Sequence, residues 1–344
     1  MKKSRVLVLL VLIIGLVGCG NQTKNESTGS ENVSDNSGDA ITIKIGHVEP
    51  ESRSTHRALE TFKKNVEDRT GGKISVELYP NGSLGGDVQL TESVAMGTLD
   101  AALPSTSVFT TYSKEFGVLD MPYLFTSSEA AFNALDGEVG AHFNEALASQ
   151  GLKNLGYSYN GPRSTTTSVR PIEKPEDLKG IKMRVMESPV FIDFYTTLGA
   201  NATPMSFTEL YTGLQQGTVE AQENPPSLIF SNKFYEVQEY LSVDEHVHNF
   251  LGFIMNQGKF DSLSDENKQI IEEEAVNFVN EQRAMELVDN EQAIKDLETE
   301  GGLTVNTLTV EQKQAFRDAL APMYDKYTSE FGQELFDMCA NYNK

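Results

Sequence analysis

Hydrophobic and polar positions alternate in two early segments of the chain and follow a helical spacing between them. Residues 41–47 and 74–80 alternate one by one, as expected of strands with one buried face. The apolar residues between these segments recur at helical spacing, at Ala58, Leu59, Phe62 and Val66. A second helix is predicted over 87–96, and the order strand, helix, strand, helix indicates a parallel α/β sheet.

A short turn recurs in the two halves of the chain. Residues 95–101 read Ala-Met-Gly-Thr-Leu-Asp-Ala, and residues 215–221 read Gln-Gln-Gly-Thr-Val-Glu-Ala. Gly97 and Gly217 stand where a left-handed residue ends a helix, and a strand is predicted after each. The repeat fits recurring helix-to-strand turns, and it equally fits two related domains with a ligand cleft between them.

One long helix is predicted near the C-terminus. Residues 264–300 contain neither proline nor glycine, and their apolar residues recur at helical intervals. At 1.5 Å per residue the helix would be roughly 50 Å long, which exceeds what one small domain needs. We therefore expect it to bridge both halves of the molecule.

The N-terminal residues resemble a bacterial lipoprotein leader. A basic start precedes an apolar run over 6–17 that is too short to cross a bilayer comfortably. Residues 16–19 read Leu-Val-Gly-Cys, which resembles a lipobox, so 1–18 are predicted to be a signal peptide and Cys19 the lipidated residue. A cysteine placed there by chance is the alternative. Residues 19–40 are too polar to fold and are predicted to be a disordered tether.

Charge and cysteine content exclude several partners. Removal of Lys2, Lys3 and Arg5 with the leader leaves 25 basic residues against 50 acidic ones. Such an acidic chain argues against nucleic acid, and an anionic ligand would have to be held by a few local arginines. Cys339 has no partner once Cys19 is lipidated, which argues against a disulfide framework and a zinc site. No metal or cofactor is expected.

Several segments together resemble one protein family over essentially the whole chain after the leader. In sequence order they are Leu78-Tyr79-Pro80, Leu84-Gly85-Gly86, residues 119–125, Tyr159-Asn160-Gly161-Pro162-Arg163, residues 174–185, residues 198–205, Gln222-Glu223-Asn224-Pro225 and residues 233–238. Each is weak alone, but the order and spacing are specific. The chain is thus similar to the solute-binding proteins of tripartite ATP-independent (TRAP) transporters, the DctP family.

The resemblance implies a fold and a division of the chain. It implies an α/β, two-lobed fold like that of periplasmic binding proteins, with a ligand cleft between the lobes and a long helix spanning both. Lobe I is expected to comprise 41–161 and 250–289. Lobe II is expected to comprise 162–249 and 290–344.

Three side chains are expected from the resemblance to bind the ligand. Residues 181–185 alternate as a strand, so Arg184 lies at the carboxyl end of that strand, where a guanidinium can clamp a carboxylate through two hydrogen bonds. A structural ion pair is the alternative for Arg184. Arg163 corresponds to a second ligand arginine, with a hinge salt bridge as the alternative. Asn224 corresponds to the ligand asparagine of the family. Phe207 is expected on an apolar face of the ligand, or else in the core.

Five further candidates rest on position alone, because they follow strands or begin a helix: His47, Glu49, Asp87, Ser105 and Glu187. A carboxylate at Glu187 beside the clamp would repel a second ligand carboxylate and accept hydrogen bonds from hydroxyl groups. A lone histidine such as His47 is more often structural, and so is a surface pair such as His246 and His248.

The favoured function is that of an extracellular solute-binding lipoprotein, held on the outer face of the cell membrane by its lipid. It would capture a small carboxylate, preferably a uronate or aldonate, by cleft closure and deliver it to TRAP membrane subunits as a monomer. C4-dicarboxylate or other organic-acid binding and ligand presentation to a sensor are alternatives. An extracellular lyase or hydrolase is disfavoured, because the nucleophile-elbow and zinc-protease motifs are absent from the sequence.

Overall fold

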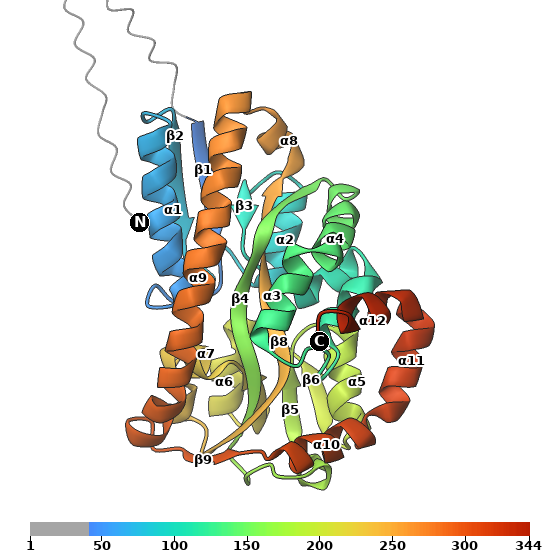
Figure 1. The fold of residues 1–344 in the computed structure, drawn as a ribbon. Coiled ribbons are helices and arrows are strands. Elements are labelled where there is room, and N and C mark those ends of the chain that lie inside the picture. The colour runs from blue at the N-terminus through green and yellow to red at the C-terminus, as the bar shows by residue number, and fades with distance from the viewer. Residues whose placement is uncertain (1–40) are drawn as a thin grey trace, which may run out of the picture. The chain divides into compact units, whose positions relative to one another are not determined.

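One mixed β-sheet runs through the folded part of the chain (Figure 1). The structure, a computed structural model, describes residues 41–344, so the predicted signal peptide, Cys19 and the tether at 19–40 lie outside the described residues. The strands within them are β1 (Ile41–Gly46), β2 (Ile74–Tyr79), β3 (Ala101–Ala102), β4 (Leu152–Thr167), β5 (Lys182–Val185), β6 (Asn201–Pro204), β7 (Ala221–Asn224), β8 (Tyr240–Asn256) and β9 (Thr304–Thr307).

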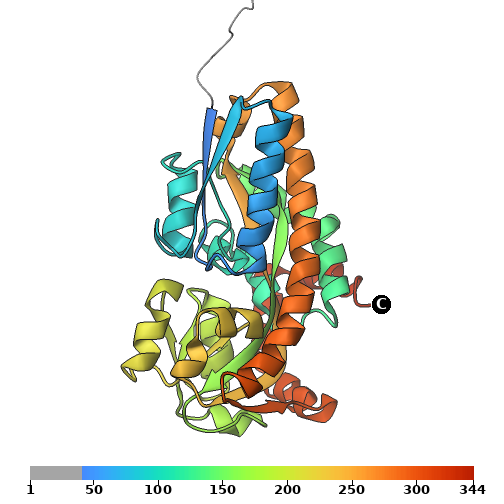
Figure 2. The ribbon, with the colours of Figure 1, turned by 90° about the vertical axis from the view of Figure 1, so that its left-hand side faces the viewer.

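The two longest strands, β4 and β8, each run through both halves of this sheet. They pair antiparallel with each other at its centre, and the strand order is β2-β1-β3-β8-β4-β7-β5-β6, with β9 beside β8. The end of β8 pairs with β3, next to β1 and β2, and the end of β4 pairs with β7, next to β5 and β6. These two halves are the lobes of the predicted α/β fold, and the blue and yellow elements of Figure 2 lie one above the other accordingly.

Helices cover both halves of the sheet. The α-helices are α1 (Ser54–Arg69), α2 (Asp87–Ala95), α3 (Ser128–Asp136), α4 (Glu138–Ala148), α5 (Pro189–Thr197), α6 (Phe207–Gln215), α7 (Pro226–Ser231), α8 (Gln257–Asp261), α9 (Asp265–Thr299), α10 (Val310–Ala319), α11 (Ala321–Phe331) and α12 (Gln333–Ala340). Short 3-10 turns are η1 (Thr106–Thr111), η2 (Lys114–Asp120), η3 (Pro175–Leu178) and η4 (Phe234–Glu236).

The early sequence patterns are confirmed by these elements. The alternating segments form β1 and β2, which pair in parallel, and the helical spacing between them forms α1. Gly97 and Gly217 have φ values of +73° and +67°, in the left-handed region that glycine adopts without strain. Each ends a helix four residues before the next strand begins, as the repeated turn predicted.

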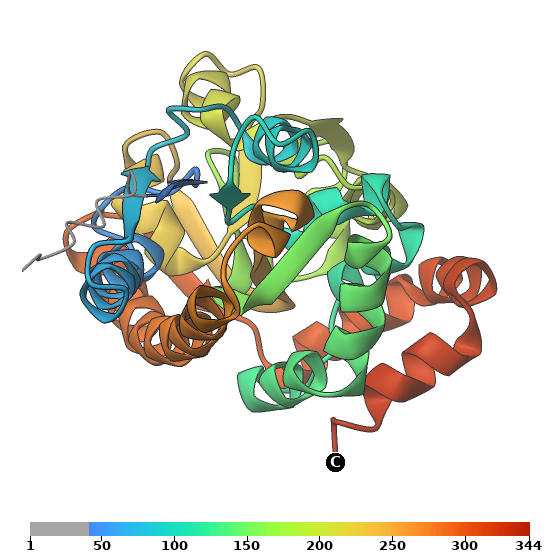
Figure 3. The ribbon, with the colours of Figure 1, turned by 90° about the horizontal axis from the view of Figure 1, so that it is seen from above.

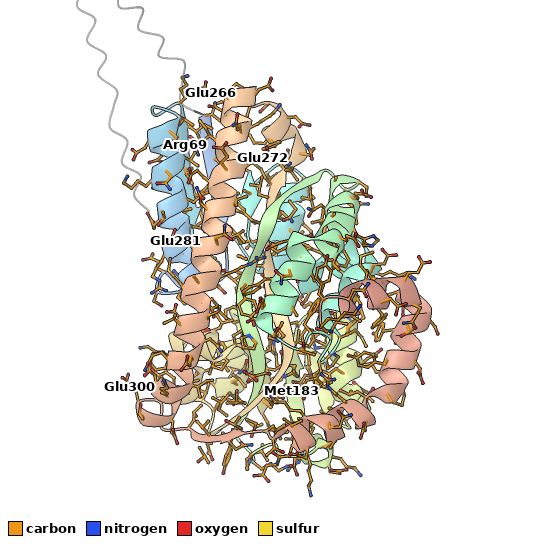
Figure 4. The ribbon with its side chains drawn as sticks, in the orientation of Figure 1. Arg69, Met183, Glu266, Glu272, Glu281 and Glu300 are labelled. Atoms are coloured by element: carbon orange, nitrogen blue, oxygen red, sulfur yellow. The ribbon has the colours of Figure 1, made fainter. Side chains whose placement is uncertain are left out.

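Helix α1 buries its apolar face between the sheet and α9. Phe62 packs edge to face against Phe253 of β8 and Phe278 of α9, with ring centroids 5.3 and 6.5 Å apart. At its C-terminal end, Arg69 donates to the carboxylates of Glu273 and Glu274 on α9 at 2.5 and 2.6 Å. Figure 4 labels Arg69 at this position beside α9.

Helix α9 is the long helix predicted from residues 264–300. Ser264 caps it by accepting a hydrogen bond from the backbone N–H of Asn267 at 3.2 Å, and Asp265 and Glu266 lie in its positive first turn. It packs along α1 in one half and along α7 and β9 in the other. With 35 residues it is about 50 Å long.

The C-terminal helices pack on the side of α4, away from α1 (Figure 3). The hydroxyl of Tyr342 accepts a hydrogen bond from the backbone N–H of Glu138 at 3.1 Å, and Asn343 accepts one from that of Thr126 at 3.0 Å. The end of the chain, assigned to lobe II in the sequence analysis, thus touches residues assigned to lobe I. The lobe boundaries stay a prediction.

Candidate functional site

A small cavity lies where strands of both halves end. Its volume is about 20 Å³, roughly enough for one water molecule. It is lined by Val48, Glu49, Asp87, Ser105, Asn160, Arg163, Arg184, Met186, Phe207, Asn224, Leu228 and Leu251. The polar members among them are almost completely buried, so their hydrogen bonds must come from the protein or from a bound molecule.

Seven of the nine side chains expected at a ligand site line this cavity, namely Arg184, Arg163, Asn224, Phe207, Glu49, Asp87 and Ser105. His47 does not. Its ring lies 3.1 Å from His56 (Nε2 to Nδ1), and burial lowers the pKa of His47 to about 4. Glu187 is half-buried and also lies outside the cavity lining.

Arg184 reaches the cavity because of strand alternation. Met183, labelled in Figure 4, and Val185 point into the hydrophobic core, so Arg184 between them faces the other side of the sheet. Its Nε donates to the backbone carbonyl of Met205 at 2.9 Å, while its buried Nη1 has no hydrogen-bond partner among the described residues. Burial lowers the pKa of Arg184 to about 10. This guanidinium is charged, buried and only partly satisfied, which favours a bound anion beside it.

Arg163, in contrast, is held by protein groups. Its Nη2 donates to the carboxylate of Glu223 at 2.9 Å, to the backbone carbonyl of Glu223 at 2.6 Å and to Asn224 Oδ1 at 2.9 Å, and its Nε donates to the same carboxylate. Only Nη1, which bonds Asn249 at 3.3 Å, is weakly engaged. The salt bridge considered as an alternative for Arg163 is therefore present, at the wall of the cavity.

The amide of Asn224 also has protein partners at both ends, because its nitrogen donates to Gln222 at 2.6 Å. Phe207, at the start of α6, is partly buried and packs against Phe234 with ring centroids 5.8 Å apart. It also touches the cavity, so core packing and ligand contact are compatible for this residue.

A buried histidine stands behind Glu223. His246 Nε2 lies 3.3 Å from the Glu223 carboxylate, and Nδ1 lies 3.0 Å from Asp244. Although burial opposes the charge, these two carboxylates raise the pKa of His246 to about 9. The expectation that His246 belongs to a surface pair is wrong, because its side chain is fully buried and its ring packs against Phe194 and Tyr195 of α5. A run of alternating charges thus leads from Asp244 to Arg163.

Carboxylates line the part of the cavity contributed by lobe I. Asp87 begins α2 and accepts a hydrogen bond from the backbone N–H of Ser105 at 3.0 Å, and burial raises its pKa to about 6. Glu49 follows β1, and its buried Oε2 has no hydrogen-bond partner among the described residues. Acceptors therefore lie on one side of the cavity and the Arg184 donor on the other.

Asn160, which lines the cavity, and Arg53, which supports Glu49, were not predicted from the sequence. Asn160 lies within the segment Tyr159-Asn160-Gly161-Pro162-Arg163, where an amide before a turn could have been considered. Arg53 had no local signal, since its partners Asn160, Ser227 and Glu286 are more than 100 residues away in the chain.

Residues 41–344 hold no group of three or more His, Cys, Asp and Glu side chains arranged to hold a metal ion. In the same residues, every helix is too short or too polar to be a candidate membrane span.

The chain is similar to proteins that bind small acids. Residues 45–330 match the sequence profile described as bacterial extracellular solute-binding protein, family 7 (DctP). The chain is 36% identical to the 2,3-diketo-L-gulonate-binding periplasmic protein YiaO of Escherichia coli K12, with 82% of this chain and 85% of the relative covered. It is 32% identical to the C4-dicarboxylate-binding protein DctB of Bacillus subtilis 168, with 97% of each covered.

A solved structure shares the fold as well as the sequence similarity. It is the sugar acid binding protein DctPAm of Advenella mimigardefordensis in complex with galactonate, with a TM-score of 0.85 and 35% identity. The comparison covers 88% of this chain and 99% of that protein.

Proposed function

Because this chain belongs to the DctP family of extracellular solute-binding proteins of TRAP transporters, we propose that it captures a sugar acid, an aldonate or a uronate, in the cavity beside Arg184. The bound acid is delivered to the membrane subunits of the transporter. The observation that carries the proposal is the guanidinium of Arg184, buried with Nη1 unpaired among the described residues and facing a cavity.

A carboxylate is the ligand group that best matches this guanidinium. Nε of Arg184 is held by a backbone carbonyl, which fixes the plane of the head group and leaves the terminal nitrogens for a ligand. A carboxylate accepts parallel hydrogen bonds in that plane and compensates the buried charge. Arg163, with one weakly engaged nitrogen, and Asn224 complete this side of the site.

The rest of the cavity favours hydroxyl groups over a second carboxylate. Glu49 and Asp87 present acceptor oxygens, and Glu187 adds negative charge close enough to affect the pKa values of Asp87 and Arg184. Hydroxyl groups donate to such oxygens, whereas a second carboxylate would be repelled by them. Relatives that bind 2,3-diketo-L-gulonate and galactonate support a sugar acid as the ligand. Because another relative binds C4-dicarboxylates, succinate is included in the ligand screen below.

The proposal includes the mode of attachment and the assembly. Cys19 carries a lipid that holds a monomeric protein on the outer face of the cell membrane, with 19–40 as a tether. Mass spectrometry of protein isolated from membranes should find a diacylated N-terminal cysteine. An unmodified Cys19, or an N-terminus at another residue, would refute the anchor.

A ligand screen tests the capture of sugar acids. Thermal denaturation is followed with galactonate, gluconate, glucuronate, galacturonate, succinate and the neutral sugar galactose. A ligand that binds only the folded protein, present at about 100 times its dissociation constant, stabilises by about 2.7 kcal/mol. We expect stabilisation by at least one sugar acid and none by galactose. Stabilisation by succinate alone would replace the sugar acid with a dicarboxylate.

A further inference from the structure

Glu49 and Arg53 form a buried pair four residues apart in the loop between β1 and α1. Glu49 is 1% exposed and Arg53 is 2% exposed. Nη2 of Arg53 lies 3.3 Å from Oε1 of Glu49. The second oxygen of Glu49, Oε2, is buried without a partner among the described residues, and Glu49 lines the cavity. The two oxygens of one carboxylate therefore have different surroundings.

Arg53 is fixed by groups from three other elements. Its Nη1 donates to Glu286 of α9 at 3.0 Å and to the hydroxyl of Ser227 on α7. Its Nη2 donates to the backbone carbonyl and to the side-chain oxygen of Asn160 on β4, both at 3.1 Å. Rotation of the guanidinium would break several charge-assisted hydrogen bonds at once, so its direction is set by the fold.

This arrangement determines which oxygen of Glu49 can meet a ligand. Oε1 is bound by Arg53, whose orientation is fixed. Oε2 is a buried acceptor, and leaving it without a hydrogen-bond donor costs free energy. A ligand hydroxyl is a donor, and a ligand carboxylate is not. Arg53 also offsets the charge of Glu49 through an ion pair at Oε1.

Resting on the proposed function, we infer that Glu49 is a specificity-determining residue that accepts a hydrogen bond from a hydroxyl of the bound acid, and that Arg53 is the positioning residue that directs its free oxygen. The ligand class is then a polyhydroxy monocarboxylate, with its carboxylate at Arg184 and a hydroxyl at Glu49. A dicarboxylate of similar length places an acceptor against Oε2 and is rejected.

Calorimetric titration with galactonate and succinate separates this role from a merely structural one. The variants are Glu49→Gln and Arg53→Gln, with the neighbouring surface changes Glu51→Gln and Arg57→Gln as matched controls. We expect Glu49→Gln to weaken galactonate binding at least tenfold and to lower the ratio of galactonate to succinate affinity. Arg53→Gln should lower the same ratio, and the controls should leave it unchanged. A loss of folding at Arg53→Gln would be detected by circular dichroism, and Glu49→Gln then decides alone.

The outcomes distinguish this inference from the proposed function. If the parent protein binds galactonate and Glu49→Gln keeps the parent ratio of affinities, the role of Glu49 is wrong while sugar-acid capture stands. If both variants weaken galactonate and succinate equally, the pair only stabilises the fold, and the inference is overturned. If the parent protein binds no acid in the panel, the proposed function falls and this inference falls with it.

Discussion

Arg163 on β4 and Glu223 on β7 lie on neighbouring strands and are joined through both Nε and Nη2 of the arginine, with side chains 1% and 0% exposed. His246 approaches the same carboxylate from the other side at 3.3 Å. The carboxylate between two cations keeps a lowered pKa even though burial opposes its charge. Arg163 is thereby presented to the cavity in one orientation, before any ligand is bound.

The charge on His246 predicts a pH dependence of stability. Its pKa is about 9 in the folded protein against an ordinary value of 6.5, so the folded state binds the proton more tightly. The stabilisation is complete below pH 6.5, declines above it and is lost as the pH rises through 9. It amounts to about 3 kcal/mol by linkage. Urea unfolding at pH 6 and pH 9.5 should show a larger loss of stability in the parent than in His246→Gln, and the difference between the two losses is the contribution of His246.

The surface residue His142 provides the control for that experiment. It is more than a third exposed and pairs with Glu115 at 2.8 Å. His142→Gln should therefore keep the pH dependence of the parent. Equal slopes of stability against pH for the parent and His246→Gln would show that His246 is not charged in the folded protein.

Arg184→Lys is expected to abolish most of the ligand affinity although it preserves the charge. Lysine cannot keep the bond to the carbonyl of Met205 and also present two donors in one plane. Loss of a buried charge-assisted pair costs about 2–5 kcal/mol, which corresponds to at least a thirtyfold weaker complex. Calorimetric titration with galactonate measures the affinity. Arg170→Lys is the control, because the side chain of Arg170 donates only to the backbone carbonyls of Asp177 and Lys179. Parent-like affinity of Arg184→Lys would rule out the bidentate clamp.

The volume of the cavity predicts that the lobes separate before a ligand enters. About 20 Å³ holds one water molecule, whereas pockets for small ligands measure about 300 Å³ or more. Ligand-free protein in solution should therefore be more open than the complex. X-ray scattering should give a smaller radius of gyration with saturating galactonate than without it. An unchanged radius and unchanged distances between lobes would contradict closure.

Gly161 lies where β4 passes the cavity and is expected not to tolerate a side chain. Its φ is +123°, and a Cβ added there would lie 2.7 Å from the Cβ of Pro225. Gly151 has a φ of +74° with nothing within 4 Å of such a Cβ. Gly151→Ala should cost about 1 kcal/mol from backbone strain, and Gly161→Ala a further 1–3 kcal/mol from the clash. Chemical denaturation measures both, and equal costs would show that the Pro225 contact relaxes freely.

Local sequence patterns predicted the helices and strands of this fold, whereas contacts between distant residues determine which side chains face the cavity. The alternation around Arg184 was enough to place it at a strand end, because neighbouring side chains on a strand take opposite faces. His47 could not be placed in this way. The chain turns after Gly46, and whether the ring faces the cavity or His56 depends on packing with a helix that starts several residues later.

The same limit applies to the polar groups behind the cavity. Arg53 pairs with Glu286, which is 233 positions away in the sequence, and a local pattern cannot predict a contact between such distant residues. His246 was expected at the surface, but its side chain is buried, and the carboxylates of Glu223 and Asp244 contact its two ring nitrogens.

The pairing of β4 with β8 has a consequence for how the chain folds as it is made. Leu152 pairs with Asn256 and Thr167 with Tyr240, so both halves of the sheet require β8, which is synthesised long after β4. A nascent chain shorter than 256 residues lacks the centre of both lobes. Closing such long loops makes folding slow relative to chains with local contacts. Slow folding of this kind is what export of an unfolded chain by the predicted leader would require.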